Sequence, residues 1–154
     1  MTVSFCGHAN YTERKGDKEA VLLLLERIVG DSAVEFFLGE YGNFDHFAYG
    51  CAKRFRELHS SAKLIFVTPY LNESYRKNDS SYTERRFDQV IYPPLENVPP
   101  RYAILHRNKW IAREADVLIA YITHEYGGAY TMYRHAVRAG KKIYNIAKER
   151  KSAP

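Results

Sequence analysis

Two patterns of hydrophobic residues alternate along the chain. Short continuous apolar runs, such as VSFCG at 3–7 and ADVLIAYI at 115–122, are typical of strands that are buried on both faces. Between such runs lie longer segments in which apolar residues return at helical spacing, as expected for a helix with one buried face. The clearest of these segments runs from Phe44 to Leu58. The alternation predicts strands joined by helices.

The pattern predicts each element in turn. Strands are expected at 3–7, 33–39, 62–69, 90–94, 115–122 and 141–147. Helices are expected at 17–31, 44–58, 100–114 and 128–140. Asp17 is a suitable cap for the first helix, and Gly140 suits the end of the last one. This order predicts an α/β fold, a Rossmann-like three-layer sandwich with a mainly parallel sheet.

Length and composition fit one domain. With 154 residues, of which 45% are hydrophobic and 27% charged, the chain is large enough to bury a core without metals or disulfides. We expect residues 1–154 to form a single domain, in which the polar residues 71–89 form a loop or lid. No apolar run is long enough to span a membrane and no secretion signal is evident, so we expect a cytoplasmic protein without a membrane partner.

The cysteines and the net charge exclude few functions. Cys6 and Cys51 lie within apolar patterns, which favours buried thiols over a disulfide or a catalytic cysteine. The formal net charge of +5 and the pI near 9.1 favour anionic ligands only weakly. A solvated basic surface and a nucleic-acid surface both agree with that charge.

The turns that follow the strands are the first place to seek a ligand site. In parallel α/β sheets, ligands bind beyond the carboxyl ends of the strands, near the point where strand order reverses. The turns at 39–45 and 123–131 contain glycines and open helices, whose free N–H groups attract phosphate. A tight turn also needs glycine for steric reasons, so both explanations stay open at this point.

The helix expected at 100–114 gives a separate signal. On a helical wheel with about 100° per residue, Asn108 falls at the centre of the apolar face and Arg107 on its flank. The apolar residues of that face are Ile104, Leu105, Ile111 and Ala112. A buried amide needs hydrogen-bond partners. Asn108 is therefore expected either to contact a ligand or to hold a nearby loop.

Aromatic residues are abundant near the expected ligand edge. Tyr41, Tyr70, Tyr126 and Tyr130 all follow predicted strands, and tyrosine can both stack on a base and donate a hydrogen bond. His8 follows the first strand, and a hydrogen-bonding role is favoured over a general base or a metal ligand. No His, Cys or acidic residues show metal-site spacing, so we expect neither a metal nor another cofactor.

Four segments together resemble a known family. VSFCGH, FFLGEYGNFDHFAYGCA, LIFVTPY and HRNKWIAREADVLIAYITHEYGGAYTMYRHA are similar to the YpsA-like branch of the SLOG superfamily, which includes LOG phosphoribohydrolases and DprA-type domains. The resemblance covers nearly the whole chain apart from residues 71–89 and the tail. It implies a pocket for a nucleotide or a nucleotide-derived, ADP-ribose-like ligand. In some branches it also implies cleavage of a bond between base and ribose.

The resemblance carries over to particular residues. The LOG arginine corresponds to Arg107, nine residues before Asp116, and the LOG glycine motif is matched by Gly127, Gly128 and Thr131. The chain departs from the family patterns at Ala9, Glu40, Asn108, Tyr126, Tyr130 and Arg134. Asn108 replaces a lysine, Tyr126 a proline, Tyr130 a glycine and Arg134 the catalytic glutamate. Ala9 and Glu40 stand where YpsA-like proteins usually have an arginine and a second glycine.

The missing glutamate bears on chemistry. Hydrolysis of an N-glycosidic bond needs a carboxylate to activate water or to stabilise the oxocarbenium-like transition state. Arg134 supplies no carboxylate. The catalytic candidates are therefore Arg107 together with Glu125 or Asp45, although both acids also read as ordinary surface residues. A binding protein is favoured over a hydrolase.

The sequence thus predicts a sensor or sequestering protein for a nucleotide-derived signal. The expected ligand-binding residues are Gly7, His8, Gly39, Tyr41, Gly42, Pro69, Tyr70, Arg107, Asn108, Tyr126, Gly127, Gly128, Tyr130, Thr131 and Met132. One alternative is a LOG-like N-glycoside hydrolase acting on a nucleotide, and another is a DprA-like partner of single-stranded nucleic acid. A homo-oligomer is expected for each of these three functions.

Overall fold

A single parallel sheet forms the centre of the molecule. The computed structural model describes residues 1–72 and 86–147. Within these residues the strands are β1 Thr2–Gly7, β2 Val34–Leu38, β3 Ala62–Val67, β4 Gln89–Ile91, β5 Val117–Tyr121 and β6 Lys142–Asn145. They lie in the order β4-β3-β2-β1-β5-β6, and every neighbouring pair is parallel. Strand order therefore reverses between β1 and β5.

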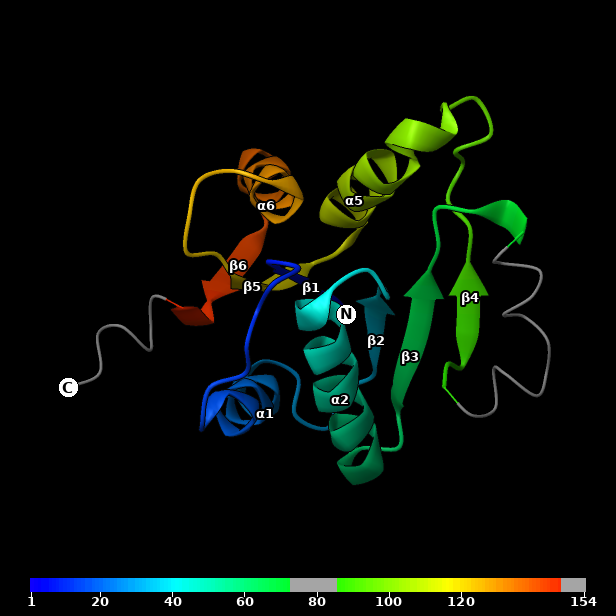
Figure 1. Ribbon diagram of the computed structural model, residues 1–154. Helices are drawn as coiled ribbons and strands as arrows, with labels where there is room; N and C mark the ends of the chain where they lie inside the picture. Colours follow the sequence, from blue (N-terminus) through cyan, green and yellow to red (C-terminus); the bar gives the residue numbers. More distant parts are fainter. Residues whose placement is uncertain (73–85, 148–154) are drawn as a thin grey trace.

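Helices cover both faces of this sheet. The described helices are α1 Asp17–Ile28, α2 Asn43–Leu58, α5 Ala103–Glu114 and α6 Gly128–Arg138, with a short 3-10 helix η1 Pro100–Tyr102 ahead of α5. Helices α1 and α2 lie on one side of the sheet, and α5 and α6 lie on the other (Figure 1). The predicted three-layer, Rossmann-like α/β fold is confirmed, and the sheet is parallel throughout its described strands.

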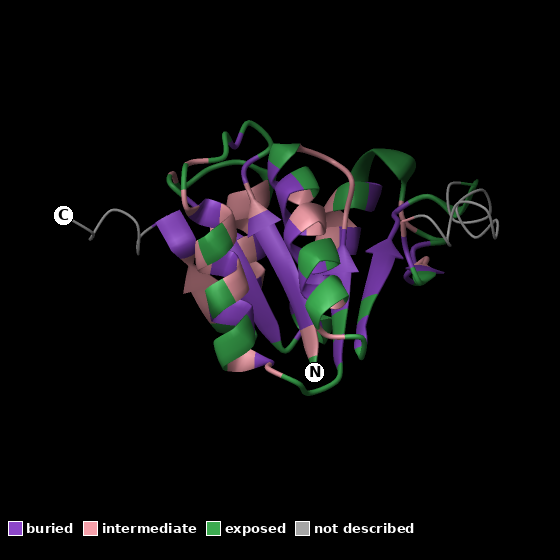
Figure 2. Ribbon diagram, turned by 90° about the horizontal axis from the view of Figure 1, so that it is seen from below, coloured by how far each residue is buried: buried purple, intermediate pink, exposed green. Residues whose placement is uncertain are grey.

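Two hydrophobic cores lie on the two faces of the sheet. Alternate residues of a strand point to opposite faces, so Phe36 packs with α1 and α2 while its neighbour Phe37 packs with α5 and α6. Figure 2 shows the strands buried between helices that are exposed on their outer faces. The predicted apolar face of α2 is buried from Phe44 to Phe55, but Leu58, the last residue of α2, is exposed. That end of the helix extends beyond the core.

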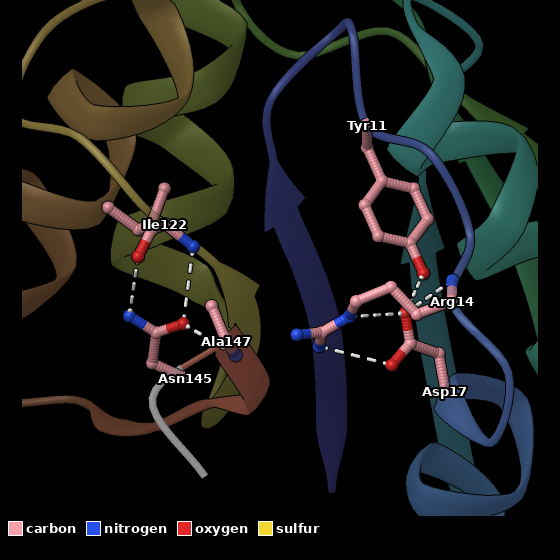
Figure 3. A network of polar contacts seen from close by, with 6 residues as sticks. All are labelled: Tyr11, Arg14, Asp17, Ile122, Asn145 and Ala147. Carbon is pink, nitrogen blue, oxygen red and sulfur yellow. Dashed lines mark hydrogen bonds and ion pairs between the residues drawn. The ribbon is translucent and has the colours of Figure 1, made fainter. Parts of the chain in front are cut away.

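The start of α1 differs from the prediction. Gly16, not Asp17, precedes the first helical turn, and Asp17 is the first residue of the helix. Its carboxylate is fully buried and accepts hydrogen bonds from Tyr11 Oη at 2.5 Å and from the Arg14 backbone N–H at 3.0 Å (Figure 3). Burial alone would raise the pKa of Asp17, but the hydrogen bonds from Arg14 and Tyr11 bring that pKa below its usual value. Asp17 therefore fixes the loop after β1 instead of capping the helix.

A second polar contact holds the end of β5. Asn145, at the end of β6, accepts a hydrogen bond from Ile122 N at 3.2 Å and donates one to Ile122 O at 3.1 Å (Figure 3). Its oxygen also accepts from Ala147 N at 3.2 Å. The Asn145 side chain thus continues the pairing of the two strands by one residue. The loop between β5 and α6 begins directly beyond it.

Two further expectations concern the polar segment and membranes. The predicted loop or lid at 71–89 lies largely outside the described residues, which omit 73–85. In the described part of the chain, no helix combines the length and the apolar character that crossing a membrane requires.

Candidate functional site

A cavity lies at the carboxyl edge of the sheet, where strand order reverses. Its volume is about 400 Å³, and the β1–α1 loop, the start of α2, α5 and the β5–α6 turn form its walls. This is the position at which parallel α/β sheets bind their ligands. The volume also falls within the range of small-molecule sites. The cavity is therefore the candidate functional site.

Most of the residues predicted to bind ligand line this cavity. They are Gly7, His8, Gly39, Tyr41, Arg107, Asn108, Tyr126, Gly127, Gly128 and Met132. Pro69 and Tyr70 instead line a second cavity of about 320 Å³ beside β4 and η1. Gly42, Tyr130 and Thr131 line neither cavity. The cavity thus joins segments that are far apart in the sequence but does not include every turn residue.

Arg107 is the buried polar residue of α5, which corrects the helical-wheel prediction. The buried face of this helix is formed by Ala103, Arg107, Ile111 and Ala112. On this face Arg107 has only 4% of its surface exposed, whereas Asn108 is half-buried. Ile104, expected on the apolar face, is exposed to 37%. The wheel was wrong because the face turns toward the sheet edge, where a guanidinium reaches polar backbone.

The guanidinium of Arg107 is held by the protein itself. Its Nη1 donates a hydrogen bond to Val67 O at 3.3 Å, and its Cζ lies 5.2 Å from the centre of the Tyr41 ring. A Cβ atom added to Gly39 would lie 2.5 Å from Nη1 and 3.0 Å from Asp45 Oδ2. Gly39 is therefore needed to admit the two charged side chains. Whether Gly39 also contacts a ligand stays a prediction.

Asp45 is the carboxylate that lines the cavity. It lies in the first turn of α2, and its Oδ2 accepts a hydrogen bond from Tyr41 N at 2.8 Å. Glu125, the other carboxylate considered from the sequence, is exposed and does not line the cavity. A negative charge near a helix N-terminus is stabilising. Asp45 thus supports the loop before α2 while facing the site.

The turn between β5 and α6 forms the open wall. Gly127 precedes α6 with φ 92° and ψ 174°, a region that is essentially restricted to glycine. Gly128 follows with no positive φ, and a Cβ atom there would meet nothing within 4 Å. Among the described residues, nothing accepts a hydrogen bond from the N–H groups of Gly128, Ala129 or Tyr130. This helix end is open to the cavity.

Two residues of α6 that were predicted to bind ligand, Thr131 and Tyr130, contact other residues of the helix instead. The Thr131 hydroxyl donates to Gly127 O at 3.0 Å, one turn back in the helix. The Tyr130 hydroxyl accepts from Arg134 at 3.0 Å, and its ring stacks against Tyr133. Arg134, which the sequence resemblance aligns with the LOG glutamate, is exposed and does not line the cavity. The contribution of α6 is therefore limited to its first turn and Met132.

His8 has the hydrogen-bonding geometry expected of it, together with a partner that the sequence did not reveal. Its Nε2 accepts from Thr123 N at 3.0 Å, and its ring stacks on His124 with centroids 3.6 Å apart. The Tyr126 ring lies 4.0 Å from the other imidazole, that of His124. Burial and the charge of His124 lower the pKa of His8 below its ordinary value. His8 is therefore neutral at pH 7.

Cys6 also lines the cavity. Its thiol donates to Ala129 O at 2.9 Å, and burial raises its pKa to about 12. A thiol with such a pKa is a poor nucleophile at neutral pH. The prediction that Cys6 and Cys51 are buried free thiols is confirmed.

Sequence reasoning missed several lining residues. They are Ser4, Phe5, Cys6, Ala9, Asn10, Ile104, Ile111, His124 and Ala129. His124 had a signal, because it lies in a loop already suspected from its glycines. Most of the others are apolar residues whose exposure to a cavity depends on how helices and strands pack.

The comparisons with known proteins add no family. No protein-family model matches the chain, and a search of the curated proteins finds no significant relative. Within the described residues, no three His, Cys, Asp or Glu side chains are grouped so as to hold a metal ion. Any functional conclusion therefore rests on the geometry of the cavity and on the sequence resemblance.

Proposed function

We propose that the chain binds a nucleotide or a nucleotide-derived signal, of the nucleoside monophosphate or ADP-ribose type, in the cavity at the carboxyl edge of the sheet. It acts in this proposal as a sensor or sequestering protein. The resemblance to the YpsA-like branch of the SLOG superfamily supports the ligand class. The position of the cavity at the reversal of strand order agrees with it.

Gly128 is the observation that carries the proposal. Neither its backbone conformation nor the packing around it requires glycine, since a Cβ atom would have open space. Glycine also weakens a helix relative to alanine. A ligand phosphate that approaches the N–H groups of the first turn closely explains why no side chain is present there.

The other walls supply complementary groups. The Arg107 guanidinium contributes positive charge to the lining of the cavity, and Tyr41 and Tyr126 offer rings for a base. Asp45 is an acceptor for the hydroxyl groups of a ribose. A phosphate at the α6 turn and a ribose near Asp45 together match the chemistry of a nucleotide.

Calorimetric titration with AMP and with ADP-ribose tests the proposal. Wild-type protein should bind at least one of them and should bind adenosine more weakly, because adenosine lacks the phosphate. Gly128→Val should reduce affinity by about tenfold or more, or about 1.4 kcal/mol, because the new side chain covers the N–H groups. Arg134→Ala, on the outer side of the same helix, is the matched control and should bind normally.

An unchanged affinity in folded Gly128→Val protein would place the ligand elsewhere. Mass spectrometry of small molecules released from the purified protein, beside thermal-shift measurements with AMP, ADP-ribose, cyclic ADP-ribose and NAD, identifies the natural class. If no nucleotide is released and none stabilises the fold, the proposed function is wrong.

One observation favours a hydrolase as the second candidate. Asp45 brings a carboxylate into the same cavity as Arg107. In such a reaction water is added across the bond between base and ribose, so that C1′ gains the hydroxyl and the base gains the proton. Repeated release of adenine from AMP, abolished by Asp45→Asn but not by Glu125→Gln, would establish hydrolysis. We expect no such turnover.

A further inference from the structure

The loop between β5 and α6 is anchored at its first two residues. Asn145 holds Ile122 through both backbone groups, as described above, and His8 holds Thr123 through the bond to Thr123 N. Beyond Thr123 the loop carries His124, Tyr126 and Gly127, which form one wall of the cavity. The orientation of that wall thus depends on an anchor supplied by the β1–α1 loop.

The anchor works in only one protonation state. A backbone N–H can only donate, so His8 Nε2 must accept, and this nitrogen must carry no proton. The stacked ring of His124 strengthens this requirement, because a positive charge on His8 would lie against a second titratable imidazole at 3.6 Å. His8 is also 94% removed from solvent, with 6% of its surface exposed. A charged imidazolium there would lose most of its hydration.

The titratable and charged groups that share the cavity with His8 come from several elements. His124 lies on the β5–α6 loop, Asp45 on α2 and Arg107 on α5, and all three line the cavity with His8. Cys6 precedes it on β1 and is un-ionised at neutral pH because burial raises its pKa to about 12. The pKa of His8 is lowered first by burial and then by His124, which agrees with an anchor that is neutral at pH 7.

We propose that neutral His8 is the positioning residue for the β5–α6 wall of the cavity, and that a proton on its Nε2 releases Thr123 and weakens ligand binding. Loss of the hydrogen bond frees the loop beyond the Asn145 anchor. The uncapped N–H groups at the start of α6 then lose their fixed orientation toward the ligand. The ligand arm of this inference rests on the proposed function, whereas the loop arm does not.

The loop arm is tested without ligand by NMR. The protection of Thr123 N–H against hydrogen exchange, corrected for the intrinsic rate, should fall by about fivefold to tenfold between about pH 7.5 and an acidic pH at which the His8 ring is protonated, which lies below the ordinary histidine pKa of about 6.5. His8→Gln should keep the protection and remove its dependence on pH, because the Gln oxygen can replace Nε2 as acceptor but does not titrate. His8→Asn, which is too short to reach Thr123, should lose the protection at every pH.

Two controls exclude other histidines. His124→Phe keeps a ring in the stack without a titratable group, and His46→Gln removes an exposed histidine of α2 that does not line the cavity. Both variants should retain the acid-dependent loss at Thr123. A pH-independent Thr123 in the wild type, or an acid-dependent loss that persists in His8→Gln, would overturn the inference.

The ligand arm uses ADP-ribose at the same two pH values. AMP is unsuitable for this comparison, because its phosphate monoester itself takes up a proton at about pH 6, whereas the diphosphate of ADP-ribose keeps its charge. Wild-type affinity should fall on acidification by about the same factor as the Thr123 protection, and His8→Gln should bind equally at both pH values. ADP-ribose that binds the wild type equally well at both pH values contradicts the inference. If neither ADP-ribose nor AMP binds at neutral pH while Thr123 still loses protection on acidification, the proposed function fails and the link between His8 and the loop stands.

Discussion

Two turns at the carboxyl edge of the sheet both begin with a glycine of positive φ but have different surroundings. Gly42 precedes α2 with φ 145° and ψ 171°, and Gly127 precedes α6 with φ 92° and ψ 174°. Both conformations are essentially restricted to glycine, and neither helix has a side-chain cap among the described residues. From the sequence, both turns looked equally suited to a phosphate.

The protein fills the first turn and leaves the second open. Ala9 O accepts from Asn43 N at 2.9 Å at the start of α2, and Arg107 and Asp45 lie against Gly39. At the start of α6, a Cβ atom on Gly127 or Gly128 would meet nothing within 4 Å. A glycine turn at the start of a helix therefore predicts the backbone conformation of that turn. The space around the turn decides whether a ligand has access.

Alanine at the two conformationally restricted glycines should give the largest effect on stability. Both variants should lose about 1 to 3 kcal/mol to backbone strain. Gly42→Ala should lose a further 1 to 3 kcal/mol, approximately, to crowding, because its Cβ would lie 2.9 Å from the Ala9 Cα. Chemical denaturation of the matched pair measures the difference.

Equal losses for Gly42→Ala and Gly127→Ala would mean that the crowding at α2 relaxes freely. The filled turn and the open turn would then not differ in what a Cβ atom costs in free energy of unfolding. Equal m-values in the two variants are the control, because they show that the unfolding transition itself has not changed.

Gly39→Ala should have an intermediate effect. Its Cβ would lie 2.5 Å from Arg107 Nη1, and a shift of this buried guanidinium weakens the hydrogen bond to Val67 O. We expect a loss of about 1 to 2 kcal/mol in the free energy of unfolding. Gly39→Ala combined with Arg107→Ala should lose less than the sum of the single variants, since the second change removes the clash. Strict additivity would show that Arg107 is not what Gly39 accommodates.

Gly128→Ala should have the smallest effect on stability, and of opposite sign. Alanine is better than glycine in a helix, so the free energy of unfolding should rise by about 0.5 kcal/mol. Thermal denaturation checks this directly. A clear loss of stability would mean that Gly128 serves the fold, and the open space above it would lose its functional meaning.

The sequence predicted the fold better than the site. Continuous apolar strands and the helical spacing from Phe44 to Phe55 depend only on local pattern, and these elements are confirmed. The cavity depends on how elements pack, which one wheel does not reveal. Arg107 and Asn108 illustrate this. They are neighbours in the sequence, but Arg107 is buried and Asn108 is only half-buried.

The side chains that surround the turns could not be predicted from the sequence either. Thr131 matched a family motif, yet its hydroxyl serves the helix by binding Gly127 O. His124 gave no motif, yet it stacks on His8 and lines the cavity. Residue types indicated which loops to consider, and three-dimensional packing selected the side chains within them.

The most direct test of the account is a titration of ¹⁵N-labelled protein with AMP, followed by amide NMR shifts in both turns. The largest and saturable shifts should occur at Gly128, Ala129 and Tyr130, the amides at the open start of α6. Asn43 N–H, already bonded to Ala9 O, should move little. Shifts concentrated at residues 39–43, with the α6 amides unmoved, would contradict the claim that the open turn is the anion site.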